Sequence, residues 1–333
     1  MTATESEPHT TMKAVVRDSY GSPDVLELRE VEKPELADDG ILVRVHASSV
    51  NRGDWHALTG TPLLARPMMD GLLRPKSPLI GGDFAGIVEA VGSQIGDLQP
   101  GDEVFGGRTG AFAEYVCARM GFARKPANLT FEEAAAIPVA ALTALQGLRD
   151  HAGLEAGQRV LVNGASGGVG TFAVQVAKAL GAEVTAVCST RNVEQAGALG
   201  ADEVVDYSRD DFTRIGRRHH LLLDIAGSKS WSGYRRALEP DGKLVIVGAR
   251  GGGLLGPLGH VGRVKLASSL RGSQTATFFI AKFNRPDMAV LRDLAEERKI
   301  KPVVERRYDL SEVGDALRYM GDGHVRGKLV VTI

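Results

Sequence analysis

The sequence predicts an α/β protein with two domains: a doubly wound parallel sheet covered by helices, and a second domain rich in β-strands. Before residue 130, short apolar runs are separated by turns that contain Gly, Pro and Asp. From residue 159 onward, apolar runs alternate with segments of helical period, the pattern of a parallel sheet with helices on both faces. A glycine-rich turn joins the first of these strands, at residues 160–162, to the helix that follows.

The composition is that of a globular protein. The chain has 333 residues, 43% hydrophobic and 24% charged, with a formal net charge of −1. This charge gives no support for binding nucleic acid or a membrane surface, and no apolar run approaches the length of a membrane helix. Residues 1–11 are polar and lack the hydrophobic centre of a signal peptide, so we expect a disordered tail. Cys117 and Cys188 indicate neither a disulfide framework nor a thiolate metal cluster, and we expect a reducing cytoplasm.

The first part of the chain is expected to contain strands at residues 12–17, 41–47, 81–92, 100–105 and 111–117. Residues 50–60 form a polar segment with Trp and His. Residues 61–78 contain four prolines and predict a long loop, a feature that often serves as a functional lid.

The pattern changes near Thr130. Thr130 and Glu133 form a capping-box pattern ahead of an Ala-rich run, so a helix is expected to begin there, and Pro138 to kink or restart it. Later strands are expected at residues 182–188, 202–206, 221–225, 243–247, 275–280 and 327–333, and helices at 231–238, 264–269, 287–298 and 311–320, with a glycine-rich loop over 248–262. The predicted division is a tail (1–11), a β-rich domain (12–130 and 272–333) and a parallel-sheet domain (131–271).

The glycine turn has the register Ala165-x-Gly167-x-x-Gly170. A missing Cβ at Gly167 lets backbone amides approach a pyrophosphate, and Gly170 lets the helix pack closely on its strand. The N-terminus of that helix offers free N–H groups and partial positive charge to phosphates. The pattern therefore favours a dinucleotide site; the alternative is a glycine turn without a ligand.

The next strand, residues 182–188, ends without the acidic residue that an NAD site uses to bind the ribose 2′-hydroxyl. Ser189, Thr190 and Arg191 stand there instead, and a guanidinium with hydroxyls suits a 2′-phosphate. We therefore predict NADPH as the cofactor. Ser189 and Thr190 could also cap a helix that starts near Asn192.

Six segments together resemble the medium-chain dehydrogenase/reductase superfamily, on its zinc-free, quinone-oxidoreductase-like branch. They are Ser-Val-Asn-Arg-Gly-Asp (49–54), Gly-Ile-Val-Glu-Ala-Val-Gly (86–92), Pro-Gly-Asp-Glu-Val (100–104), Asn-Gly-Ala-Ser-Gly-Gly-Val-Gly (163–170), Leu-Gly-Ala-Asp-Glu-Val-Val-Asp-Tyr (199–207) and Gly-Lys-Leu-Val-Val (327–331). The segment before residue 81 is similar to the subgroup of reticulon-interacting mitochondrial reductases. The resemblance implies a Rossmann domain, a GroES-like catalytic domain, and a homodimer in which residues 275–280 pair edge to edge.

The resemblance also bears on metal binding. Zinc-containing relatives have Cys where Asn51 stands and a His-Glu pair where Gly82 and Asp83 stand, and residues 106–110 replace their four-cysteine loop. A catalytic zinc needs about three protein ligands. Because Asn51 and Gly82 are not zinc ligands, and the adjacent His219 and His220 are far from other ligands in sequence, we expect no metal.

The same resemblance assigns catalytic positions. Asn51 is expected to face the nicotinamide and the substrate oxygen. His56 is a candidate proton donor or substrate hydrogen-bonder, since imidazole titrates near neutrality; the alternative is an exposed polar residue beside Trp55. Asp54 could orient either group or be structural.

The resemblance assigns cofactor contacts to further residues. The pyrophosphate is expected at Gly167, Gly168, Val169 and Gly170, the 2′-phosphate at Ser189 and Arg191, the adenosine end at Tyr207, and the nicotinamide half at Thr143, Gly248, Phe278 and Phe279. Lys328 is expected to reach the cofactor from the last strand, and the expected cofactor-binding set also includes Ala165, Ser166 and Thr190. Since successive strand residues point to opposite faces, at least one of Phe278 and Phe279 is expected in a core.

Without a metal to stabilise an alkoxide, an activated acceptor is the easier substrate. The expected function is NADPH-dependent reduction of a quinone or α,β-unsaturated carbonyl by hydride transfer. The alternatives are a zinc-independent NADP-dependent alcohol dehydrogenase or carbonyl reductase, and an NADPH-binding interaction or regulatory protein with little turnover.

Overall fold

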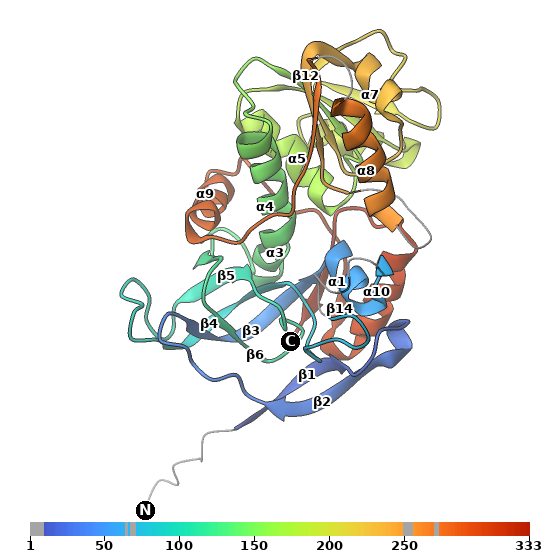
Figure 1. Ribbon diagram of the computed structural model, residues 1–333. Helices are drawn as coiled ribbons and strands as arrows, with labels where there is room; N and C mark the ends of the chain where they lie inside the picture. The colour runs from blue at the N-terminus through green and yellow to red at the C-terminus, as the bar shows by residue number, and fades with distance from the viewer. Residues whose placement is uncertain (1–9, 64–65, 67–70, 249–255, 270–272) are drawn as a thin grey trace, which may run out of the picture.

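The computed structural model describes residues 10–63, 66, 71–248, 256–269 and 273–333. Two lobes are stacked in Figure 1, a parallel-sheet lobe above and a β-rich lobe below, and the C-terminus lies in the lower one. Within the described residues, no helix is both long and apolar enough to cross a membrane. The predicted α/β fold class, a parallel-sheet domain with a second, β-rich domain, is confirmed.

The upper lobe is built on a six-stranded parallel sheet in the order β10-β9-β8-β11-β12-β13. This is the doubly wound order, with the first strand, β8, at the centre. Such strands are apolar throughout because helices cover both faces: Val160, Leu161 and Val162 are all fully buried. The strands are β8 (Arg159–Asn163), β9 (Glu183–Cys188), β10 (Glu203–Asp206), β11 (His219–Asp224), β12 (Leu238–Ile246) and β13 (Thr275–Phe278).

The lower lobe contains a seven-stranded sheet in the order β14-β15-β3-β4-β5-β7, with β6 paired to β3. The C-terminal strand returns to it: β15 lies antiparallel to β3, with Leu329 opposite Val50. The strands are β3 (Ile41–Val50), β4 (Asp83–Val91), β5 (Glu103–Gly107), β6 (Tyr115–Ala118), β7 (Phe122–Arg124), β14 (Val304–Asp309) and β15 (Lys328–Thr332).

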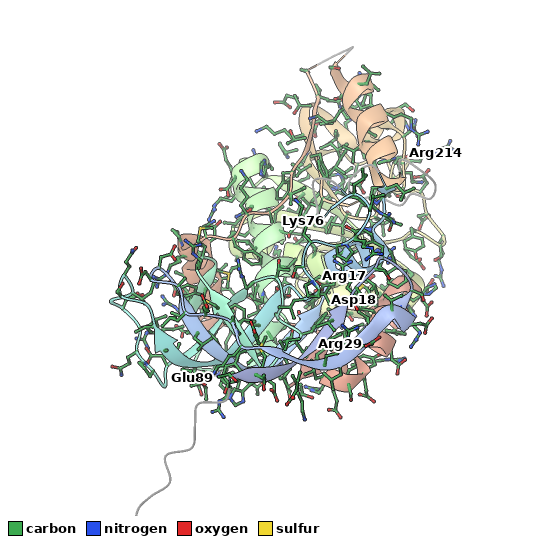
Figure 2. The ribbon with its side chains drawn as sticks, turned by 60° about the horizontal axis from the view of Figure 1, so that its bottom comes forward. Arg17, Asp18, Arg29, Lys76, Glu89 and Arg214 are labelled. Carbon is green, nitrogen blue, oxygen red and sulfur yellow. The ribbon has the colours of Figure 1, made fainter. Side chains whose placement is uncertain are left out.

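A separate two-stranded ribbon, β1 (Thr11–Arg17) with β2 (Leu26–Glu32), crosses the lower end of the molecule. Figure 2 shows its charged residues, among them Asp18 and Arg29, which form an exposed ion pair at 2.7 Å. Arg17 is instead buried, and its guanidinium donates to the carbonyl of Ala57.

The helices follow the sequence signals closely. Thr130 and Glu133 form the predicted capping box, and Pro138 is the first residue of the next helix. The helices are α1 (Arg52–Thr59), α3 (Phe131–Ala135), α4 (Pro138–Gln146), which continues as a π-helical turn over Gly147–His151, α5 (Gly168–Ala179), α6 (Val193–Ala198), α7 (Trp231–Ala237), α8 (Gly256–Ser269), α9 (Arg285–Glu296) and α10 (Val313–Gly321).

One apolar core extends across both lobes. Ala47 and Phe105 of the lower sheet belong to the same buried cluster as Val160 and Leu223 of the upper sheet. Helix α4 packs against α5 of the upper lobe and also contacts β4 and β5 of the lower sheet. The two lobes therefore have a fixed relative position on this side, next to the site described below.

Several expectations need correction. Strand β13 pairs with β12 in the upper sheet, so the predicted domain boundary at residue 272 falls too early. Helix α3, predicted in the parallel-sheet domain, contacts β3 and β4 and so packs on the lower sheet. The sequence analysis did not predict α1, β2, β7 or β14. Helix α1 buries only Asp54 and Leu58, and β2 and β14 are rich in charge, so their apolar periodicity is weak. Residues 1–9, 64–65, 67–70, 249–255 and 270–272, which include most of the predicted tail and parts of two predicted loops, lie outside the described residues.

Candidate active site

The glycine turn lies at the carboxyl end of β8, where the parallel sheet presents ligands to the other domain. The backbone N–H groups of Gly164 and Ala165 both donate to the carbonyl of Val187 in β9, at 3.1 and 3.0 Å, which fixes the turn on the sheet. A Cβ on Gly170 would lie 2.1 Å from the carbonyl oxygen of Gly164, so α5 packs on the turn as closely as predicted.

The other residues of the turn differ in their surroundings. A Cβ on Gly167 would meet only the Gly164 oxygen, at 3.9 Å, so the space above the start of α5 is open. Ala165 is buried, and Val169 is half-buried against the core shared by the lobes. An open helix N-terminus over a close-packed glycine turn fits the pyrophosphate of a nicotinamide dinucleotide.

The turn also contacts the last strand of the other lobe. The N–H of Gly327 donates to the carbonyl of Ser166 at 2.8 Å, and Gly167 and Gly327 form a parallel β-bridge. The side chain of Lys328 passes beside Gly168, whose Cβ would lie 3.0 Å from the Cδ of the lysine. The turn and the start of β15 are therefore held together.

At the end of β9, the predicted 2′-phosphate residues have partners within the protein. The Ser189 hydroxyl oxygen accepts from Asn192 at 3.0 Å, and Arg191 donates to the carbonyl of His324 at 2.6 Å. Ser189 precedes a short 3₁₀ turn, Thr190–Asn192, but its side chain makes no capping hydrogen bond to it.

Asp206 is an acidic residue at this position that the sequence analysis did not identify. It ends β10 opposite Cys188 and accepts from the Thr190 hydroxyl at 2.6 Å. That hydrogen bond holds the pKa of Asp206 below its usual range, so the carboxylate is charged. Tyr207, predicted near the adenosine, is the next residue and is exposed. A cation, Arg191, and an anion, Asp206, therefore both lie at the end of β9.

Across from the turn, Asn51 is part of a buried polar cluster. Its Nδ2 donates to Oδ2 of Asp83 at 2.8 Å, and Ser49 donates to the same oxygen at 2.6 Å. The ammonium of Lys328 donates to Oδ1 of Asn51 and lies 3.3 Å from Oδ2 of Asp83. Asp83 and Lys328 are only 0% and 2% exposed, so this is an ion pair removed from water.

Asp54 stabilises the start of α1. Its carboxylate accepts from the backbone N–H of Asn51 at 2.7 Å, which completes a capping box. Burial raises the pKa of Asp54 to about 7. Gly82 leaves room between these groups, since its Cβ would lie 3.5 Å from Asp54 and 3.7 Å from the amide nitrogen of Asn51.

Asp83 also positions α4. Its Oδ1 accepts from the backbone N–H of Val139, in the first turn of that helix, at 2.9 Å. Thr143 follows one turn later on the same face, partly exposed, with its hydroxyl donating to the Val139 carbonyl at 2.6 Å. Thr143 is thus connected to the cluster through Val139.

His56 is half-buried on α1, so it is not the exposed polar residue of the alternative interpretation. Its Nδ1 is buried and has no hydrogen-bond partner among the described residues. Burial, assisted by the charge of Arg52, lowers the pKa of His56, so the neutral imidazole predominates near pH 7.

The remaining predicted residues lie along β12 and β13. Gly248 packs against the residue that follows β11, since its Cβ would lie 2.6 Å from the carbonyl oxygen of Ile225. Phe278 is half-buried against the core on one face of the sheet, whereas Phe279 is buried on the other and stacks on His151 at 4.1 Å. The expectation that at least one of the two packs in a core is confirmed for Phe279.

His219 and His220 have structural partners. His219 is buried between the Thr185 hydroxyl and the Ala237 carbonyl, and Nδ1 of His220 accepts from the N–H of Arg159 at 3.1 Å. Across the described ranges, no group of three or more His, Cys, Asp or Glu side chains is arranged to hold a metal ion.

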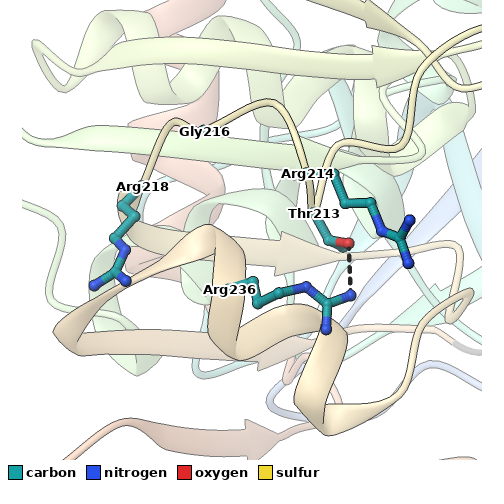
Figure 3. A pocket seen from close by; sticks show the side chains of 5 residues that line it. All are labelled: Thr213, Arg214, Gly216, Arg218 and Arg236. Atoms are coloured by element: carbon teal, nitrogen blue, oxygen red, sulfur yellow. Dashed lines mark hydrogen bonds between the residues drawn. The ribbon is translucent and has the colours of Figure 1, made fainter.

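A hollow of about 470 Å³ lies elsewhere on the upper lobe, lined by Thr213, Arg214, Gly216, Arg218 and Arg236 (Figure 3). Arg236 donates to the Thr213 hydroxyl across it at 3.1 Å. Arg218 immediately precedes β11, so the hollow lies at the amino edge of the sheet, away from the glycine turn at the carboxyl edge.

The fold and the glycine turn define a two-domain, nicotinamide-dependent oxidoreductase. Residues 37–128 match the family model described as alcohol dehydrogenase GroES-like domain, and residues 199–331 match the one described as zinc-binding dehydrogenase. The chain belongs to the quinone-oxidoreductase-like branch of the medium-chain dehydrogenase/reductase superfamily.

Three relatives illustrate this membership. The chain is 34% identical to the mitochondrial NAD(P)H oxidoreductase RTN4IP1 of Mus musculus, over 99% of this chain and 91% of the relative. It is 31% identical to the chloroplastic quinone-oxidoreductase QR1 of Triphysaria versicolor, over 96% and 98%. The solved structure of the quinone oxidoreductase from Coxiella burnetii superposes with a TM-score of 0.83 at 31% identity, covering 97% of this chain and 99% of that one.

Proposed function

We propose that this protein uses NADPH to reduce quinones or α,β-unsaturated carbonyl compounds, and does so without zinc. The observation that supports this most directly is the buried cluster of Asn51, Asp83 and Lys328. Where zinc-containing relatives have a Cys and a His, this chain has Asn51 and Gly82, and a lysine ammonium lies next to Asp83. A divalent cation beside that ammonium would be repelled by it and would lack the usual three ligands.

Bound NADPH would supply the hydride. Asn51 donates a hydrogen bond from Nδ2 to the carbonyl oxygen of the acceptor, which polarises it for attack. His56 also donates a hydrogen bond to the acceptor; because its pKa is lowered, it is neutral near pH 7 and is better suited to binding than to proton donation. Conjugated acceptors need only this help, since the electron pair of the hydride is delocalised onto oxygen and the resulting enolate or hydroquinone anion takes its proton from solvent. Oxidation of a plain alcohol needs a stronger electrophile.

The preference for NADPH rests on Arg191 and the two adjacent hydroxyls. Arg191 is exposed, and in the part of the chain that the structure describes it donates to the carbonyl of His324, so it can exchange this partner for a 2′-phosphate. A charge-assisted contact of this kind is stronger than the one it replaces. The Asp206 carboxylate works in the opposite direction, but its charge is partly satisfied by the Thr190 hydroxyl.

The test measures oxidation of NADPH and NADH with a panel of quinones, enones and aldehydes, and of alcohols with NADP⁺, before and after treatment with a strong chelator. We expect turnover of quinones or enones with NADPH, unchanged by the chelator. Turnover of aldehydes alone would instead indicate a carbonyl reductase or alcohol dehydrogenase. Tight NADPH binding with no turnover of any acceptor would indicate an interaction or regulatory protein.

We further propose that the protein is a homodimer that pairs through β13. This strand has a neighbour on one side only, β12, in the described sheet. Ile280, just beyond it, is 74% exposed. Light scattering should give twice the mass of one chain, and Ile280→Lys, which places a charge beside the free edge, should give monomers. A monomeric wild type would contradict the proposal.

A further inference from the structure

We propose that Lys328 is a positioning residue that fixes the Asn51 amide as a hydrogen-bond donor and connects it to the glycine turn of the cofactor site. The inference rests on the proposed function for the statement that Asn51 contacts the acceptor. The orientation of the amide and its connection to the turn do not depend on which acceptor is used.

The orientation of the Asn51 amide follows from its two charged neighbours. Oδ1 accepts from the Lys328 ammonium, and Nδ2 donates to the Asp83 carboxylate at 2.8 Å. A flipped amide would direct N–H groups at the ammonium and a carbonyl oxygen at the carboxylate, so both contacts would become repulsive. With Oδ1 occupied by the ammonium, the amide presents N–H rather than a carbonyl oxygen to a ligand. Besides Asp83, its Nδ2 has a long contact, 3.4 Å, to the Ser49 carbonyl and interacts with the Asp54 carboxyl group.

Lys328 is held from two sides. Its strand, β15, pairs with β3, the strand that leads directly to Asn51. On the other side, Gly327 donates to Ser166 at 2.8 Å, and the lysine stem lies beside Gly168 at the start of α5. A shift of the glycine turn on binding a dinucleotide would therefore be transmitted through Gly327 and Lys328 to the Asn51 amide.

The electrostatic arrangement explains why the residue must be a cation. Two buried carboxyl groups, Asp83 and Asp54, face this small volume. Burial raises the pKa of Asp54, and the charge of Asp83 raises it further, whereas Lys328 lowers it. An uncharged side chain at position 328 would leave Asp83 as an unpaired buried charge and would release the Asn51 amide.

The first experiment separates positioning from simple charge neutralisation. Lys328→Met removes the ammonium, and Lys328→Arg keeps a cation. Lys328→Met combined with Asp83→Asn removes both charges of the ion pair. The control is Lys301→Met, a substitution at an exposed lysine. We expect Lys328→Met to lower kcat for a quinone about 10- to 100-fold, the worth of a hydrogen bond to a charged group, with little change in KM. The double variant should regain melting temperature but not kcat, and Lys328→Arg should recover part of kcat. Recovery of kcat together with melting temperature in the double variant would overturn the proposal.

The second experiment needs no turnover and so separates this inference from the proposed function. In protein with ¹⁵N-labelled Asn, the side-chain amide signal of Asn51 is assigned by its loss in Asn51→Asp. We expect NADP⁺ to shift this signal in the wild type and in Lys301→Met, and to shift it much less in Lys328→Met at matched saturation. An equal shift in Lys328→Met would refute the connection, whatever acceptor the protein reduces.

Discussion

Gly170 and Gly167 belong to one glycine pattern, yet the structure predicts opposite consequences for replacing them with Ala. A Cβ on Gly170 would lie 2.1 Å from the Gly164 oxygen and 2.7 Å from the Cα of Ala165, both backbone atoms that cannot rotate away. A Cβ on Gly167 would meet one atom at 3.9 Å, and the φ of this residue, −82°, suits any side chain.

The expected changes in the free energy of unfolding differ accordingly. Inserting a methyl into a close-packed site costs about 1–3 kcal/mol, and the helical preference of Ala over Gly, about 1 kcal/mol, offsets only part of that cost for Gly170→Ala. For Gly167→Ala, the poorer N-cap lowers the free energy of unfolding, whereas the less flexible unfolded chain raises it. The net change should therefore be less than about 0.5 kcal/mol.

The assay is denaturant unfolding of the cofactor-free protein, together with NADPH binding followed by fluorescence. We expect Gly170→Ala to be destabilised and Gly167→Ala to unfold like the wild type. Gly167→Ala should nevertheless bind NADPH at least about tenfold more weakly, because its methyl enters the space over the helix N-terminus. Wild-type stability of Gly170→Ala, or equal stability losses in both variants, would refute this reasoning.

Two further predictions concern charge. The pKa of Asp54 in the folded protein is raised to about 7, so between about pH 4 and 7 the unfolded state binds fewer protons than the folded state. The free energy of unfolding therefore falls as the pH rises through this range, by at most about 1.4 kcal/mol per pH unit. The melting temperature of Asp54→Asn should therefore rise relative to that of the wild type between pH 4 and 7, and the difference should stay constant above pH 7. Parallel curves of melting temperature against pH for the two proteins would contradict the raised pKa. Arg191→Ala should weaken NADPH binding about tenfold or more and leave NADH binding unchanged, with Arg214→Ala, at the distant hollow, as the control; equal losses for both cofactors would exclude contact with a 2′-phosphate.

Much of the fold could be predicted because its signals are local. The apolar runs of β8, β9 and β11 are continuous since helices cover both faces of a parallel sheet, and the Thr130 capping box lies within four consecutive residues. Helix α1 and strands β2 and β14 could not be predicted, because they bury few of their side chains and lack an apolar period. The assignment of β13 to the upper sheet depends on which strand it pairs with, and that pairing has no local signal.

By itself the sequence determined the doubly wound domain, the glycine turn and the presence of Asn51, Asp54 and His56 in one short segment. Only the tertiary structure decided how these groups are charged and oriented. Lys328 and Asp83 are 245 residues apart, and their ion pair forms because β15 returns beside β3 and buries both. Asp206 likewise meets Thr190 only through the parallel pairing of β10 with β9. The physical reason is that the pKa of a side chain and the direction of its hydrogen bonds depend on burial and neighbours, which residues distant in sequence supply.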